Sequence, residues 1–292
     1  MTGYRGRFAP TPSGALHFGS LIAALASFLD ARRAEGEWLL RIEDIDPPRC
    51  PSGAADTILR QLEAFGLHWD GPVLWQHSRD PAYAAALERL EALGLAYPCS
   101  CSRKQWREYP IYPGWCREGL RERGKPTAWR LRSDLGLRPV VWQDRLFGEQ
   151  RFDPADLGDV VLKRKDGLWA YQVAVVVDDA EQGISDVVRG YDLLDNTPWQ
   201  RQLQHALRLP EPRYLHLPLI TNRDGQKLSK QNLAPALPCD DRAVRPLLHR
   251  ALAALDQAPP DEFRMAPVQE QLAWAIDHWE PNRIRPEAHR QE

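Results

Sequence analysis

The feature that most restricts the fold of this chain is a strand, helix and strand pattern within its first fifty residues. A short apolar strand is expected at residues 6–9, followed by a turn that contains two prolines and a glycine. Apolar side chains then recur at helical spacing from Leu21 to Leu29, with Ser20 as the expected N-cap. A second compact strand is expected at residues 38–42. Two strands joined by a helix of this length favour a parallel, doubly wound sheet.

The remaining chain continues this α/β pattern around a segment of different character. Apolar periodicity predicts helices at residues 54–65, 81–93, 198–207, 241–255 and 267–278. Short strands are expected at residues 128–132, 140–142 and 215–220. An almost continuous apolar run at residues 169–177, after a hairpin-type turn at 165–167, predicts a buried strand.

These patterns divide the chain into four expected segments. Residues 1–96 and 167–238 are predicted to form the two halves of a Rossmann-type catalytic domain. Residues 97–166 lack long helical periodicity and are expected to form a small inserted module, largely of strands. Residues 239–292 are expected to form a short helical extension.

Composition restricts the class of protein. Basic and acidic residues number 38 and 40, so the net charge of −2 excludes a generally basic nucleic-acid-binding protein. The inserted module nevertheless carries arginines that could face RNA locally: Arg103, Arg107, Arg117, Arg121, Arg123, Arg130 and Arg132. No apolar run reaches the ~18–20 residues of a membrane span, and the first residues resemble no signal peptide. Five unevenly spaced cysteines fit a reducing compartment, so a cytoplasmic location without membrane contact is expected.

The turn and helix start at residues 9–20 carry the first chemical motif. A helix N-terminus presents unpaired N–H groups and a partial positive charge, to which a phosphate can bind. Gly14 and Gly19 would let a nucleotide approach the backbone closely, and His17 adds a hydrogen-bond donor. A surface histidine explains His17 taken alone. The whole string of proline, glycine and histidine residues favours nucleotide binding.

The second motif is the loop Lys227-Leu228-Ser229-Lys230-Gln231. Two lysines on a loop can close over a polyphosphate and stabilise the charge that develops on departing pyrophosphate. Taken alone, such a short tract is more often a solvated loop.

A cluster of cysteines in the inserted module suggests zinc. The three cysteines fall within eighteen residues and are Cys99, Cys101 and Cys116. Structural zinc sites normally have four ligands, and Tyr112 is the candidate for the fourth, with His77 or Glu118 as alternatives. Three free, partly buried thiols are the competing explanation.

In their order and separation, the two nucleotide motifs resemble the HIGH and KMSKS signatures of class I aminoacyl-tRNA synthetases; Gln231 replaces the final serine. Further strings are similar to the glutamyl-tRNA synthetase catalytic domain over residues 1 to about 240: 7–11, 41–46, Tyr171, 177–179, 187–190 and 196–198. The resemblance implies a class I synthetase-type Rossmann domain that binds ATP with Mg²⁺ through His17, Gly19, Lys227, Ser229 and Lys230. It makes His17 and Lys230 the catalytic residues.

The same resemblance implies a pocket for L-glutamate. Glutamate has two carboxylates and an ammonium group, so a selective pocket needs fixed cations and an anion. Arg7 and Arg189 can supply the cations and Glu43 the anion, while Tyr171 offers a hydroxyl and a ring wall. The remaining pocket residues are Phe8, Ala9, Pro10 and Thr11. An arginine at position 189 favours the carboxylate of glutamate over the neutral amide of glutamine.

The short C-terminal part narrows the resemblance. About sixty residues follow Lys230, too few for an anticodon-binding domain. With the run at residues 45–49 and the C-x-C…Y-x₃-C pattern, this resembles the glutamyl-Q tRNA(Asp) synthetase family, shortened paralogues of glutamyl-tRNA synthetases. Such enzymes esterify activated glutamate onto the cyclopentenediol of queuosine, at the wobble position of tRNA(Asp). The resemblance therefore implies the anticodon stem-loop as partner, a monomer, and one structural Zn²⁺ on Cys99, Cys101, Tyr112 and Cys116.

Three alternatives remain open on the residues alone. A glutamyl-tRNA synthetase without an anticodon domain would charge the 3′ end of a tRNA. A small-molecule nucleotidyltransferase of the same superfamily would need His17 and Lys230 but no glutamate pocket. A non-catalytic RNA-binding paralogue would tolerate the loss of these residues, and neither is lost.

Overall fold

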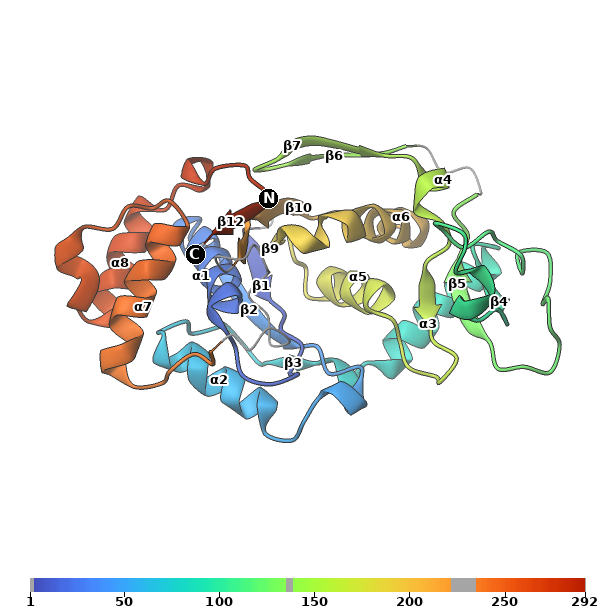
Figure 1. The fold of residues 1–292 in the computed structure, drawn as a ribbon, viewed down its shortest axis with the longest axis horizontal. Coiled ribbons are helices and arrows are strands. Elements are labelled where there is room, and N and C mark those ends of the chain that lie inside the picture. Colours follow the sequence, from blue (N-terminus) through green and yellow to red (C-terminus); the bar gives the residue numbers. More distant parts are fainter. Residues whose placement is uncertain (1–2, 135–138, 222–234, 292) are drawn as a thin grey trace.

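The computed structural model describes residues 3–134, 139–221 and 235–291, whose arrangement is shown in Figure 1. The first sheet holds three parallel strands in the order β1 (Arg5–Phe8), β2 (Glu37–Ile42) and β3 (Leu74–Trp75). Helix α1 (Phe18–Arg33) connects β1 to β2, as the strand, helix and strand pattern predicts. The turn expected to bind a nucleotide therefore leads from the carboxyl end of β1 into the amino end of α1.

The second sheet has the strand order β7 (Gly148–Phe152), β6 (Val140–Asp144), β10 (Arg213–Leu217) and β9 (Asp186–Gly190). Strand β10 runs parallel to both β9 and β6, whereas β7 is antiparallel to β6. The two sheets adjoin where the N–H of Ser185 donates to the carbonyl oxygen of Arg5 over 2.9 Å. The β6–β7 hairpin lies within residues 97–166, yet it extends the sheet that contains β9 and β10.

The other described elements surround these sheets. A small antiparallel sheet consists of β4 (Ala96–Cys99), β5 (Ala128–Leu131) and β8 (Val161–Lys163). The remaining helices are α2 (Ala54–Ala64), α3 (Asp80–Ala92), α4 (Pro154–Leu157), α5 (Tyr171–Glu181), α6 (Thr197–Leu207), α7 (Asp241–Ala254) and α8 (Val268–His278). Strands β11 (Leu219–Thr221) and β12 (His289–Gln291) pair in parallel. Short 3₁₀ helices span Pro47–Arg49, Gln76–Ser78, Arg103–Trp106, Tyr191–Asn196, Asp261–Met265 and Pro281–Arg283.

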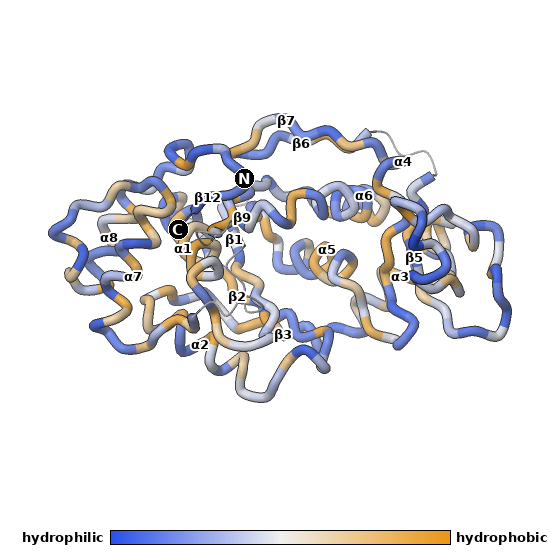
Figure 2. The backbone as a smooth tube through the Cα atoms, viewed as in Figure 1, coloured by the Kyte–Doolittle hydropathy of each residue, from blue (hydrophilic) through white to orange (hydrophobic). Residues whose placement is uncertain are grey.

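The main core forms around α1. Leu21, Leu25 and Leu29 are almost completely buried, between the strands and the C-terminal helices α7 and α8. In Figure 2 the apolar residues concentrate where α1 meets the strands, and hydrophilic segments follow the rim of the molecule. Among the described residues, no helix is both long and apolar enough to cross a membrane.

One expected strand is wrong, because residues 171–181 form helix α5 instead. The run is apolar on every side because α5 packs between α3 and α6 in a second core cluster, and Val173 to Val176 are all buried. Over this buried stretch the helix has no polar stripe to reveal its period, so periodicity could not distinguish it from a strand.

Two finer expectations are also corrected. The N-cap of α1 is His17 rather than Ser20, because Nδ1 of His17 accepts a hydrogen bond from the Ser20 N–H at 3.3 Å. The strand expected at residues 215–220 is divided at Pro218, which lacks the N–H needed for a continuous ladder.

Candidate active site and metal centre

A cavity of about 400 Å³ opens at the carboxyl ends of β1, β9 and β10. Parallel α/β sheets bind ligands at this edge. Its wall contains Pro10, His17 and Gly19 of the first motif. It also contains residues that the sequence patterns did not indicate, among them Asp192 and residues 217–220, where β10 passes into β11. The predicted ATP-binding residues Lys227, Ser229 and Lys230 lie outside the described residues.

A second cavity of about 360 Å³ contains the predicted amino-acid site. Seven of the eight predicted residues line it: Arg7, Phe8, Ala9, Thr11, Glu43, Tyr171 and Arg189. The eighth, Pro10, lines the first cavity. Both cavities share Phe8, Thr11, Ala23 and Gly190, so molecules bound in them would meet across this common wall. A carboxylate in one cavity could therefore reach a phosphate in the other.

Glu43 is the buried anion of the second cavity. Its Oε1 lies 3.5 Å from Nη2 of Arg41, whose Nη1 lies 2.8 Å from a carboxylate oxygen of Asp179. Burial raises the pKa of Glu43 to about 7, although the charges of Arg41 and Arg7 favour its ionised form. An incoming ammonium group would complete the environment of this carboxylate.

The two arginines predicted to bind the amino acid differ in their surroundings. Nε of Arg7 donates to Asp179 over 3.2 Å, so a carboxylate already balances part of its charge. Arg189 instead donates to Oε1 of Gln200 and Oγ1 of Thr197, each at 2.8 Å, and to Nε2 of His216 at 3.0 Å. Within the described part of the chain, no carboxylate forms an ion pair with Arg189. Its positive charge is therefore available to a carboxylate ligand.

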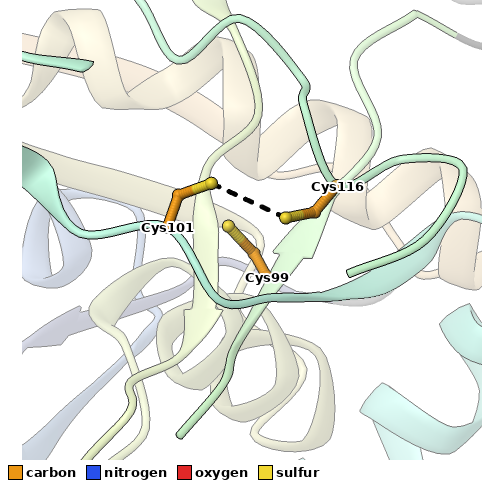
Figure 3. Close-up of side chains that lie close together, drawn as sticks. All are labelled: Cys99, Cys101 and Cys116. Atoms are coloured by element: carbon orange, nitrogen blue, oxygen red, sulfur yellow. Dashed lines mark hydrogen bonds between the residues drawn. The ribbon is translucent and has the colours of Figure 1, made fainter. Parts of the chain in front are cut away.

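The three predicted thiols converge in the inserted module. Figure 3 shows the sulfur atoms of Cys99, Cys101 and Cys116 pointing toward one another, and all three lie within 4.8 Å of each other. The Tyr112 hydroxyl lies 3.3 Å from Sγ of Cys99 and 3.5 Å from Sγ of Cys101. All four side chains are buried. Three sulfurs and a phenol oxygen at this spacing are chemically suited to Zn²⁺.

Local contacts favour this donor set over the alternatives. Burial alone would raise the pKa of Cys116, but backbone hydrogen bonds from Arg121 and Ser100 lower it to about 6, which favours the thiolate. Burial, followed by contact with the thiols, raises the pKa of Tyr112, so its phenol would lose the proton only to a bound cation. The alternative ligands are engaged elsewhere, since Glu118 pairs with Arg132 and His77 with Asp44.

The arginines of the module serve different purposes. Arg103, Arg107, Arg121 and Arg123 are exposed. Arg117 and Arg130 instead bind the buried Asp159, through its carboxylate at 2.7 Å and its carbonyl oxygen at 2.8 Å, respectively. These two arginines hold the module together, so the face available to RNA is narrower than the sequence suggested.

The family comparison matches this architecture. Residues 4–110 and 116–241 match the model of the tRNA synthetases class I (E and Q), catalytic domain. The chain therefore belongs to the class I tRNA synthetases and is an enzyme of the ligase type. Glutamate–tRNA ligases of Elizabethkingia anophelis and Elizabethkingia meningosepticum share the fold, with TM-scores of 0.84 and 0.83 at 24% identity. The match covers 100% of this chain and 68% of the E. anophelis protein, and 99% of this chain and 67% of the E. meningosepticum protein. The predicted synthetase-type α/β fold is confirmed.

Curated relatives narrow the family. A glutamyl-Q tRNA(Asp) synthetase of Thiobacillus denitrificans is 55% identical over 283 residues, which cover 94% of this chain and 92% of the relative. One from Pseudomonas aeruginosa is 54% identical over 284 residues, covering 96% and 95%. Within the class I synthetases, the chain belongs to the glutamyl-Q tRNA(Asp) synthetase family.

Proposed function

We propose that this enzyme activates L-glutamate with ATP and transfers the glutamyl group to the cyclopentenediol of queuosine in tRNA(Asp). The observation that carries the proposal is the adjoining pair of cavities, one at a helix N-terminus and one with Arg189 and Glu43 in its wall. The names of the most similar relatives agree with it.

In the first step an oxygen of the glutamate α-carboxylate attacks the α-phosphorus of ATP. A carbon–oxygen–phosphorus link forms, and the bond to the β-phosphate breaks to release pyrophosphate. His17 and the amino end of α1 lie in the wall of the nucleotide cavity, where they hold phosphate oxygens in position. Lys227 and Lys230 are proposed to stabilise the departing pyrophosphate, and Mg²⁺ bound to the polyphosphate would neutralise charge.

In the second step a hydroxyl of the cyclopentenediol attacks the carbonyl carbon of glutamyl-adenylate. The new ester forms as AMP leaves, and a phosphate oxygen of the adenylate can accept the hydroxyl proton. Glu43 and Arg189 hold the two ends of the glutamyl group during this transfer.

The inserted module is proposed to hold one structural Zn²⁺ on Cys99, Cys101, Tyr112 and Cys116. A closed set of four ligands would fix the loop after β4 against the rest of the module. The four-segment division of the chain and its monomeric state remain part of this proposal. The β6–β7 hairpin is then the part of segment 97–166 that joins the catalytic sheet.

The test is transfer of labelled glutamate to tRNA(Asp) with and without queuosine. Periodate cleaves the free 3′ diol of a tRNA and would also cleave the cyclopentenediol of queuosine. The tRNA without queuosine is therefore oxidised first, and the queuosine base is inserted enzymatically after the oxidation and before the reaction. Label on oxidised, queuosine-containing tRNA(Asp) supports the proposal, and tRNA(Asp) without queuosine should remain unlabelled. Label confined to the 3′ end of tRNA(Glu) contradicts it and favours an ordinary glutamyl-tRNA synthetase.

A further inference from the structure

A buried chain of three side chains reaches the glutamate pocket from the β6–β7 hairpin. Asp144 ends β6, and its Oδ2 lies 2.6 Å from Nδ1 of His216 on β10. On the other side of the imidazole, Nε2 lies 3.0 Å from Nε of Arg189 on β9. Asp144, His216 and Arg189 are 1%, 0% and 4% exposed, so water does not compete for these contacts. Three adjacent strands thus contribute one residue each.

The donors and acceptors allow one arrangement of protons. Nε of an arginine always carries hydrogen, so it donates to His216 and Nε2 must accept. The single proton of a neutral His216 therefore lies on Nδ1 and is donated to Asp144. Burial lowers the pKa of His216, and the nearby charge of Arg189 lowers it further, so the neutral ring is favoured. In a charged imidazole, the N–H at Nε2 would face the N–H at Nε of Arg189, so two donors and two positive charges would repel each other.

Asp144 is held in place by hydrogen bonds other than the one to His216. Its Oδ1 accepts hydrogen bonds from the backbone N–H groups of Leu146 and Phe147, each at 3.0 Å, in the turn of the hairpin. Its other oxygen, Oδ2, is therefore held in a fixed orientation toward Nδ1 of His216. This fixes both the tautomer and the rotation of the His216 ring.

The arrangement holds Arg189 without neutralising it. A carboxylate placed directly on its Nε would hold the guanidinium equally well but would compete with a carboxylate ligand. The neutral imidazole between Asp144 and Arg189 separates the two charges by the width of a ring. Arg7, which contacts Asp179 directly, provides the contrast within the same cavity.

We infer that Asp144 and His216 are positioning residues that orient Arg189 toward the side-chain carboxylate of the amino acid and thereby set the preference for glutamate over glutamine. This inference rests on the proposed function, because it assumes that glutamate is the amino acid bound. The role differs from that of a catalytic residue, since neither side chain lines either cavity.

The test measures amino-acid-dependent exchange of pyrophosphate into ATP, in the presence of tRNA(Asp), for wild type and three variants. His216→Phe keeps a ring but removes the acceptor, and Asp144→Asn removes the charge that fixes the tautomer. Both are expected to raise KM for glutamate about tenfold, with KM for ATP unchanged and a smaller change in kcat. Their preference for glutamate over glutamine should fall. His216→Gln retains an acceptor oxygen and is expected to recover most of the glutamate affinity.

Asp159→Asn is the matched control, because Asp159 is an equally buried carboxylate that binds Arg117 in the inserted module. It is expected to change the melting temperature but not KM for glutamate. Wild-type values of KM and of the glutamate preference in His216→Phe and Asp144→Asn overturn the inference. Equal losses in His216→Phe and His216→Gln also overturn it, since packing would then be the cause. If His216→Phe does not fold, Asp144→Asn and His216→Gln decide between these outcomes. A wild-type enzyme inactive with glutamate contradicts the proposed function itself.

Discussion

At the residue scale, the positive charge of Arg189, which no carboxylate of the described residues balances, makes this side chain the proposed determinant of amino-acid choice. Arg189→Cys removes a charge-assisted contact worth about 1.5–3 kcal/mol, so kcat/KM for glutamate is expected to fall about 10- to 150-fold. Glutamine, whose amide gains nothing from the cation, should be affected much less. Pyrophosphate exchange with each amino acid measures the two values. An unchanged ratio between them would show that selectivity resides elsewhere.

The carboxyl group of Glu43 is expected to make glutamate binding depend on pH. Burial raises its pKa to about 7, so near neutrality about half of the empty pockets hold an uncharged Glu43. The substrate ammonium is proposed to bind the charged form, so lower pH should oppose binding. KM for glutamate should therefore rise as the pH falls below about 7, by up to about tenfold per pH unit, and level off above it.

Two controls separate this effect from a general loss of activity. KM for ATP, measured over the same pH range, should stay flat because Glu43 does not line the nucleotide cavity. Glu43→Gln has no carboxyl group to titrate, so it should bind glutamate weakly at every pH. A wild-type KM for glutamate that does not change between about pH 5.5 and 8 contradicts the assignment of Glu43.

Seven of the residues proposed to contact the amino acid line one cavity and could be named from the sequence, whereas the side chains behind them could not. Arg7, Glu43 and Arg189 stand in strings with recognisable chemistry. His216 follows Arg189 by 27 residues, and Asp144 precedes His216 by 72 residues. Their contacts depend on the order and register of three strands, which local spacing does not encode. Only the strand pairing brings them together.

At the scale of elements, the metal centre is expected to stabilise the inserted module. Cys101→Ser removes one of three thiolates, so the purified protein should lose its zinc and melt several degrees lower. Metal analysis and thermal unfolding measure the two effects. Cys239→Ser is the control, because Cys239 is exposed and outside the cluster. Equal zinc content in Cys101→Ser and wild type contradicts the proposed ligand set.

A helix with one buried face was predictable, whereas a helix buried over most of its surface was not. Helix α2 shows an apolar stripe and begins and ends within one residue of its predicted limits. Residues 172–176 of helix α5 are all buried, so no exposed stripe marks the helix there, and its run of β-branched valines favours a strand locally. Packing against α3 and α6 outweighs this preference, because the helix satisfies its own backbone hydrogen bonds in an apolar environment.

At the scale of the whole molecule, segments far apart in sequence meet at Asp30 of α1. Its carboxylate accepts hydrogen bonds from Arg145 at 2.5 and 2.9 Å and from Nε1 of Trp279 at 2.9 Å, and it also bonds the hydroxyl of Tyr4. Arg145 belongs to the β6–β7 hairpin and Trp279 follows α8. The hairpin, the first helix and the C-terminal helices are therefore joined through one carboxylate that is 4% exposed.

Asp30→Asn is expected to lower the free energy of unfolding by about 2–3 kcal/mol, because Arg145 then loses its closest charged partner in a largely buried position. Asp186, 3.5 Å from Arg145, limits the loss. Burial alone would raise the pKa of Asp30, but Arg145 holds it below its ordinary value, so this stabilisation is present at neutral pH and lost as acid protonates the carboxylate. The difference in the free energy of unfolding between wild type and variant, measured in urea by tryptophan fluorescence, should therefore shrink at low pH.

Glu211→Gln is the control. It breaks a more exposed ion pair with Arg201 and should lower the free energy of unfolding by less than about 1 kcal/mol. If Asp30→Asn costs no more than this control, the junction at Asp30 does not hold the segments together.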